Sequence, residues 1–286
     1  MIPDKTFRAL SISSMWLWLM IFALIPSFLL LMTSLLTHGD NELLQLRLTL
    51  NNYFSVFNLS YFKVFLRSIM LASSCTVLCL LLAYPFSYIL ARSEAKYKRI
   101  LLLLVIIPFW TSSLIRSYAI VAILKTNGII NHFLLWTGII SQPLQLLYTH
   151  TATLLGLVYT LLPLMIFPIY SSIEKLDTRF IDAARDLGAN KTQVFFKVIL
   201  PLTFPGILAG SILVFLPAMT LFYIPDLLGG AKTILIGNII QNQFLAARNW
   251  PMGATISIVL TLIMSIVLIF YWRTSPKRQD SFYELH

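Results

Sequence analysis

The stretch Thr151–Tyr170 reads TATLLGLVYTLLPLMIFPIY and contains no charged side chain. A helix needs roughly 20 apolar residues to cross the hydrocarbon core of a bilayer, and this stretch has that length. Five other stretches qualify, so the predicted spans are residues 15–36, 68–90, 100–124, 151–170, 206–224 and 254–272. Backbone groups in lipid must be hydrogen-bonded within the segment, and the alternation of a membrane β-strand is absent. We therefore expect six helices.

The composition agrees with a membrane protein. Hydrophobic residues make up 58% of the 286 residues and charged residues 11%, and the mean hydropathy is +0.83. Soluble domains are typically about 45–50% apolar and about 25% charged. We expect an all-α membrane protein with one transmembrane domain, residues 1–286, and no separate soluble domain. The first apolar run is too long for a cleaved signal peptide, so we expect it to be retained.

One further apolar run, residues 129–140, is too short to span the membrane. Asn131, His132 and Gly138 also interrupt it. We expect an amphipathic helix here, either on the membrane surface or packed on the helix bundle.

The distribution of Lys and Arg predicts the orientation in the membrane. Segments 1–14, 91–99, 171–205 and 273–286 hold 14 Lys and Arg residues in 72 positions, whereas 37–67, 125–150 and 225–253 hold 6 in 86. The first set is therefore predicted to be cytoplasmic, with both termini inside. The net charge of +10 requires no nucleic-acid partner, because these residues lie beside spans, where lipid headgroups attract them.

The chain lacks the motifs of an enzyme. The nearest string to a phosphate-binding loop, Gly229-Gly230-Ala231-Lys232-Thr233, has Ala where the motif needs Gly before the Lys. The four His residues are scattered, no nucleophile elbow occurs, and Cys75 and Cys79 suit helix packing. We expect no catalytic residue, no metal site and no cofactor, and ATP hydrolysis by a separate chain.

The polar loop 171–205 has the pattern of two short helices. Asp177 is suited to cap a helix beginning at Thr178, and Gly188 is suited to end it in the left-handed conformation. The predicted apolar stripe of this first helix is Phe180, Ala183, Ala184 and Leu187.

The second helix of the loop is expected to run into the fifth span. Asn190 is its predicted cap, and its predicted apolar stripe is Val194, Phe195, Val198 and Ile199. We expect Pro201 to stop it, with Leu200 extended. From the pattern alone, the loop either docks on another protein or packs on its own bundle.

Residues 182–201 resemble the EAA motif of bacterial ATP-binding-cassette importer permeases. That motif reads Glu-Ala-Ala, three residues, Gly, nine residues, Ile, one residue, Leu-Pro. The matching positions are Ala183, Ala184, Gly188, Leu200 and Pro201. Asp182 replaces the Glu, and Val198 replaces the Ile. The resemblance implies a type I importer fold and an ATPase-docking helix, with the contact set Asp182, Ala183, Ala184, Leu187, Gly188, Leu200 and Pro201.

Further segments resemble the spermidine/putrescine branch of these permeases, and most closely the first of its two permease subunits. These segments are IPFWT at 107–111, SLIR at 113–116, YSSIEKLD at 170–177 and DLLGGAK at 226–232. The resemblance implies polyamine uptake by alternating access across the bacterial inner membrane. It also implies a heterodimer with a second homologous permease, a cytoplasmic ATPase dimer and a periplasmic substrate-binding protein.

A polyamine is a polycation on an apolar chain, so carboxylates and aromatic faces suit it. Outside the predicted cytoplasmic segments the acids are Asp40, Glu42 and Asp226. Our hypothesis is that Tyr223 and Asp226 line the outer mouth of the pathway, with Trp110 as a further contact. Asp226 could instead pair with Lys232 or Arg116, or cap a loop.

Two alternatives remain at the level of function. A permease of the same superfamily could carry another cargo, such as an amino acid or another cation or anion. An ion-coupled secondary transporter is a weaker alternative, because it predicts an internal repeat and charges at the membrane midplane, neither of which is evident.

Overall fold

The computed structural model describes residues 5–39 and 44–274. Asp40 and Glu42 lie outside these residues. Contacts divide the chain into two compact units, one of residues 1–63 and 239–265 and the other of residues 64–238 and 266–286. The expectation of a single transmembrane domain stays a prediction.

The first unit contains the N-terminal helical segment. α1 (Lys5–Leu19) continues through the π-helical turn η1 (Met20–Leu24) into α2 (Ile25–Ser34). The strands β1 (Leu36–Thr37) and β2 (Gln45–Leu48) pair antiparallel, and α3 (Asn51–Val56) follows. The start of α13 (Trp250–Thr274) is joined to α2, because Thr255 Oγ1 donates to the buried Ser34 carbonyl at 3.1 Å.

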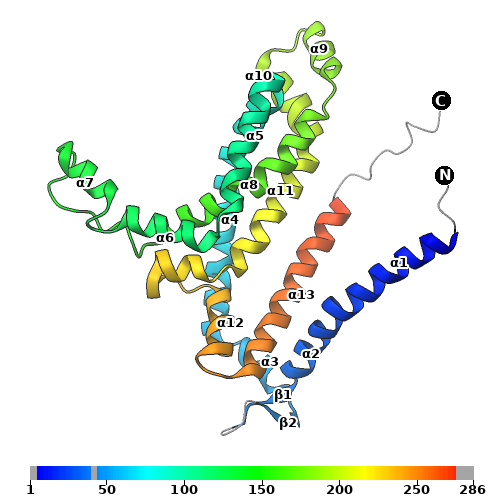
Figure 1. The fold of residues 1–286 in the computed structure, drawn as a ribbon, viewed down its shortest axis with the longest axis vertical. Coiled ribbons are helices and arrows are strands. Elements are labelled where there is room, and N and C mark those ends of the chain that lie inside the picture. Colours follow the sequence, from blue (N-terminus) through cyan, green and yellow to red (C-terminus); the bar gives the residue numbers. More distant parts are fainter. Residues whose placement is uncertain (1–4, 40–43, 275–286) are drawn as a thin grey trace. The chain divides into compact units, whose positions relative to one another are not determined.

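The second unit holds the helices that carry the candidate sites. They are α4 (Leu59–Arg92, which begins in the first unit), α5 (Ala95–Trp110), α6 (Ser113–Leu124), α7 (Ile129–Trp136), α8 (His150–Glu174), α9 (Thr178–Asp186), α10 (Lys191–Val194) and α11 (Leu200–Thr220). The π-helical turns η2 (Phe195–Ile199) and η3 (Pro225–Gly229) and the 3₁₀ turn η4 (Gly230–Lys232) complete it, with the start of α12 (Ile236–Leu245). Figure 1 shows α8 and α11 side by side, with α9 and α10 near one end of the pair.

Two kinds of contact align the helices of this unit. Cys79 Sγ donates to the Val158 carbonyl and Ser87 Oγ to the Ile166 carbonyl, so α4 and α8 run parallel with a constant offset. α11 runs the other way, since Gly206 packs on Ser172 and Pro168 and Gly210 on Met165. A Cβ on Gly206 would lie 2.6 Å from the Pro168 carbonyl oxygen, so close helix contact requires glycine there.

Six segments of the described chain are long and apolar enough to cross a membrane. The prediction of six helical spans is therefore confirmed. The segments are Ile12–Ser34, Leu59–Arg92, Ser113–Trp136, His150–Glu174, Lys191–Thr220 and Trp250–Tyr271.

The prediction of one continuous helix over 100–124 is wrong. α5 ends at Trp110, the next two residues have extended backbone, and α6 begins at Ser113. The Thr111 hydroxyl donates to the Pro108 carbonyl at 2.8 Å, which satisfies a backbone group at the break. Hydropathy cannot detect such a break, because Thr and Ser replace lost helical hydrogen bonds without adding charge.

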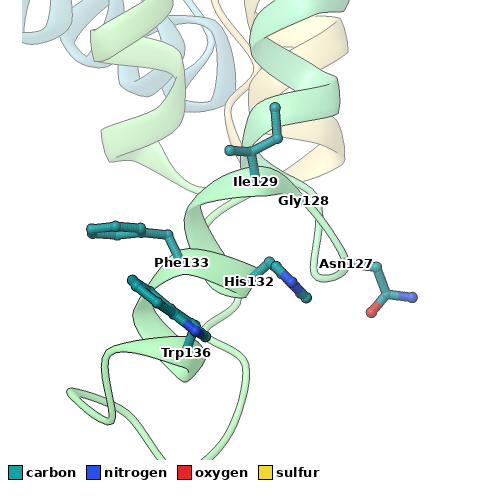
Figure 2. A pocket seen from close by; sticks show the side chains of 6 residues that line it. All are labelled: Asn127, Gly128, Ile129, His132, Phe133 and Trp136. Carbon is teal, nitrogen blue, oxygen red and sulfur yellow. The ribbon is translucent and has the colours of Figure 1, made fainter.

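The run 129–140 forms the short helix α7, which contacts α6. Buried Asn131 holds it: its amide donates to the Leu144 carbonyl at 2.8 Å and its side-chain oxygen accepts from the Leu144 N–H at 2.9 Å. An open pocket of about 510 Å³ is lined by residues 127–129, His132, Phe133 and Trp136. Figure 2 shows the rings of Phe133 and Trp136 on one side of the helix and His132 on the other. The helix is thus fixed by a polar contact, while its aromatic side chains stay exposed.

Candidate functional site

The loop between α8 and α11 has the two-helix structure that its caps predict. Asp177 Oδ1 accepts from the Arg179 N–H at 2.9 Å at the start of α9, and Gly188 follows the helix with φ +81°. Asn190 and Gln193 form a reciprocal capping box at the start of α10, with hydrogen bonds of 2.8 and 2.9 Å. Both helix starts and the intervening turn are therefore determined locally.

The loop is anchored by a small apolar cluster of Ile181, Val194 and Ile199. All three are buried, and Tyr88 of α4 packs against them together with Leu176. The neighbouring Phe195 ring stands edge-on to Tyr84 of α4, with centroids 5.6 Å apart. These contacts fix α9 and η2 on the end of α4, so the loop is part of the bundle and moves with it.

The predicted apolar stripe of α9 faces away from the protein. Leu187 is 89% exposed and Phe180 57% exposed, and Ala183 is also exposed. These three positions are spaced to lie on one face of the helix. The α9 residues that pack on the protein are instead Ile181, which is buried, and Ala184, which is partly buried. The predicted stripe included Ala184 but not Ile181. The outer stripe of Phe180, Ala183 and Leu187 is an apolar surface without a partner in the part of the chain that the structure describes.

Charge surrounds this stripe. Arg185 pairs with Asp182 at 3.7 Å, and the Arg179 guanidinium lies 2.7 Å from the Asp177 carboxylate. The Arg179 side chain and its backbone N–H hold the pKa of Asp177 below its ordinary value. Apolar residues with a charged rim are typical of protein interfaces.

The predicted end of the second loop helix is wrong. Leu200 has helical backbone (φ −60°, ψ −47°), and the chain continues through η2 into α11 without a stop at Pro201. The Leu200 N–H bonds to the Phe195 carbonyl, five residues back, as in a π-helix. This wider turn accommodates the proline ring and its missing donor. Leu200 is half-buried and Pro201 exposed, at the junction of η2 and α11.

Asp226 lies in η3 with its side chain exposed. Its partner is the Asn238 amide, which donates to Asp226 Oδ1 and, at 2.8 Å, to the Phe222 carbonyl. No ion pair joins Asp226 to Lys232 or Arg116 in the described chain, so the alternative of such a pair is wrong. Asn238 sits in an apolar stretch of sequence, and no sequence signal marked it as the residue that orients Asp226.

Tyr223 lies three positions before Asp226 in the chain and is half-buried, with its ring centroid 6.1 Å from that of Phe222. Trp110 is the last residue of α5 and is 80% exposed. Among the described residues, no hydrogen bond, ring pair or cation–π contact links Trp110 to Tyr223 or Asp226. Tyr223 and Asp226 thus lie in one segment of the chain, whereas Trp110 lies on a different helix.

Arg116 has a distinctive environment on α6. Its guanidinium lies 5.9 Å from the Phe109 ring and 5.8 Å from the Tyr159 ring, and two of its nitrogens are buried without a hydrogen-bond partner among the described residues. Aromatic faces stabilise a cation at such distances. Arg116 of α6 thus contacts one ring of α5 and one ring of α8 close to the helix break.

Residues 83–276 match the family described as binding-protein-dependent transport system inner membrane component. The chain belongs to this family. It is a permease of the inner membrane, a non-catalytic subunit of a transport system that works with a binding protein.

Two curated relatives are similar over nearly the whole permease. The spermidine/putrescine transport system permease protein PotB of Escherichia coli (strain K12) is 50% identical over 90% of this chain and 94% of its own length. The protein of the same name from Haemophilus influenzae is 47% identical over 96% of both chains. A crystal structure of a bacterial alginate ABC transporter, in complex with a periplasmic protein bound to alginate pentasaccharide, contains a chain with a TM-score of 0.75. That chain is 16% identical over 97% of this chain and 96% of its own, and this likeness supports the fold alone.

Proposed function

We propose that this permease imports spermidine and putrescine into the cytoplasm by alternating access. It would form a heterodimer with a second homologous permease, and a separate ATPase dimer and a periplasmic binding protein would complete the importer. The assignment of spermidine and putrescine as the cargo is supported by the 50% identity to PotB over nine-tenths of the chain.

The outer stripe of α9 supports the coupling role. Phe180, Ala183 and Leu187 expose an apolar surface on a helix whose other face is fixed to α4 through Ile181. A helix that inserts an apolar face into a groove transmits movement only when it is rigidly attached to its own bundle. We assign ATPase docking to α9 and its following turn, with Asp182, Ala183, Leu187, Gly188 and the exposed Pro201 in contact. Ala184 and Leu200, which are half-buried, support the attachment of the loop.

The geometry at η3 supports a cargo contact by Asp226. An exposed carboxylate held by Asn238 is oriented without being neutralised, and Tyr223 precedes it by three positions in the chain. A polyamine ammonium would be attracted by both groups. Trp110, with its exposed ring on α5, would be a further aromatic contact.

The experiment is uptake of labelled spermidine and putrescine by cells that lack the chromosomal importer and carry this permease with its partner chains. We expect uptake of both polyamines, and competition by unlabelled polyamine but not by amino acids or oxyanions. Uptake of another solute with no polyamine uptake would favour a different cargo, which the fold permits, since a chain of the same fold belongs to an alginate transporter.

The variant Asp226→Asn tests the pathway assignment in the same assay. We expect the KM for spermidine to rise several-fold, because the amide keeps the contact with Asn238 but lacks the charge. Glu94→Gln is the matched control, since it removes an exposed carboxylate charge outside the proposed pathway and should leave the KM unchanged. An unchanged KM and rate for Asp226→Asn would exclude a cargo contact at this carboxylate.

A further inference from the structure

A cationic cavity of about 460 Å³ lies in the second unit, away from α9. Its charged or ionisable lining residues are Arg67 of α4, His150 at the start of α8 and Lys232 of η4. Arg67 and Lys232 are exposed, and neither has an ion-pair partner within residues 5–39 and 44–274. Two positive charges that lack an ion-pair partner among the described residues would attract an anion, and they would repel a polyamine.

On α4 and α8, apolar lining residues follow Arg67 and His150 along the helix. Met70 and Leu71 follow Arg67 by about one turn of α4, and Leu154 follows His150 by one turn of α8. Both helices enter the predicted spans from this end, on the side predicted to be periplasmic. If the membrane begins where the predicted spans begin, at residues 68 and 151, the cations lie at its boundary and these apolar side chains lie on the hydrocarbon side of them. A ligand that matches this order has an anionic head and an apolar tail.

The walls of the cavity are joined by hydrogen bonds. Ser68 Oγ accepts from the Ile236 N–H at 2.9 Å, which connects α4 to the segment after η4. The hydroxyls of Thr153 and Thr233 lie 3.3 Å apart, which connects α8 to the same segment. The positive end of the α8 dipole also falls here, because the helix begins at His150. The cavity is thus formed by three segments that are already fixed to one another.

We propose that this cavity binds the phosphate headgroup of an anionic phospholipid of the membrane leaflet at which α4 and α8 begin. Arg67 and Lys232 hold the phosphate, the hydroxyl of Thr151 lies beside them at the start of α8, and the acyl chains run along Met70 and Leu154. Ser74, one turn beyond Met70, has its hydroxyl bonded to the Met70 carbonyl. The assignment is independent of the cargo, because its ligand has the opposite charge.

The test uses the full-length permease in its purified complex, titrated with phosphatidylglycerol or phosphatidylcholine and measured by native mass spectrometry. We expect phosphatidylglycerol to bind more tightly than phosphatidylcholine. The double variant Arg67→Gln/Lys232→Gln should weaken phosphatidylglycerol binding roughly 25-fold, since each basic residue near an anionic lipid contributes roughly fivefold. Lys125→Gln is the matched control, because it removes an exposed positive charge on the same predicted side but outside the cavity.

A variant that conserves both positive charges distinguishes loss of charge from misfolding as the cause of weaker lipid binding. Arg67→Lys/Lys232→Arg should retain most of the affinity for phosphatidylglycerol. The proposal is overturned if the double Gln variant and Lys125→Gln bind this lipid equally, or if phosphatidylcholine binds as well as phosphatidylglycerol. It is also overturned if millimolar inorganic phosphate displaces the lipid, because the site would then select a soluble anion. If the true ligand of the cavity is an acidic surface of the binding protein, the double Gln variant and Lys125→Gln should bind the lipid equally.

Discussion

The helix α9 has two apolar faces that differ in burial. On the inward face Ile181 joins Val194 and Ile199 of the following segment in the cluster against α4, whereas Phe180, Ala183 and Leu187 turn outward. Burial of one apolar face accounts for the attachment of the loop to the bundle. An apolar face that stays exposed has no role in the stability of this chain, and recognition of another protein is the function it fits.

The largest effect is expected where the outward stripe is broken. Leu187→Glu places a charge at a position that is 89% exposed, so the permease itself should fold normally. We expect at least about a tenfold loss of polyamine uptake and of ATPase co-purification, as for a central interface residue. Thr192→Glu, an exposed position of α10, is the control with the same added charge and should keep both properties. Normal uptake by Leu187→Glu would contradict docking through this face.

A smaller effect, of a different kind, is expected on the inward side. Ile199→Ala should lower the free energy of unfolding by about 2–4 kcal/mol, because it leaves a cavity at a residue that is only 4% exposed. Thermal unfolding of the purified permease would measure this change. Thr192→Ala should alter stability by no more than about 0.5 kcal/mol, as an exposed substitution does. Equal stability of both variants would show that the cluster does not anchor the loop.

The smallest effect concerns the cap that precedes the outward stripe. The lowered pKa of Asp177 means that its ionised form stabilises α9 at a pH above its ordinary pKa. This contribution is lost as the pH falls through the lowered value, since protonation weakens the bond to Arg179. The protection factors of the α9 amides, which correct exchange for the pH dependence of its intrinsic rate, should therefore fall at acid pH in the parent and be less pH-dependent in Asp177→Asn. An identical pH profile in the two proteins would exclude this contribution.

The sequence was most informative where one local interaction decides the structure. The caps at Asp177 and Asn190 and the left-handed Gly188 are confirmed, because each depends on residues within one turn. Prediction failed at the helix break after Trp110 and at Pro201. Both positions depend on how a backbone group replaces a missing helical hydrogen bond, which composition does not reveal.

The candidate site shows the same division. The apolar residues of α9 were identified from their spacing, but spacing does not say which of two overlapping stripes faces the bundle. Ile181 decided this by packing with Val194 and Ile199 from a distant turn. The orientation of Asp226 likewise depends on Asn238, twelve positions away in the chain.

The sequence by itself determined the class of this protein, the number of its spans and its family motif. Apolar length and charge are properties of each segment taken alone, so they can be read without knowledge of the fold. Only the tertiary structure decided which apolar face of the loop stays exposed, which residue holds Asp226 and that three segments bring Arg67, His150 and Lys232 to one cavity. These features depend on contacts between segments, which no single segment specifies.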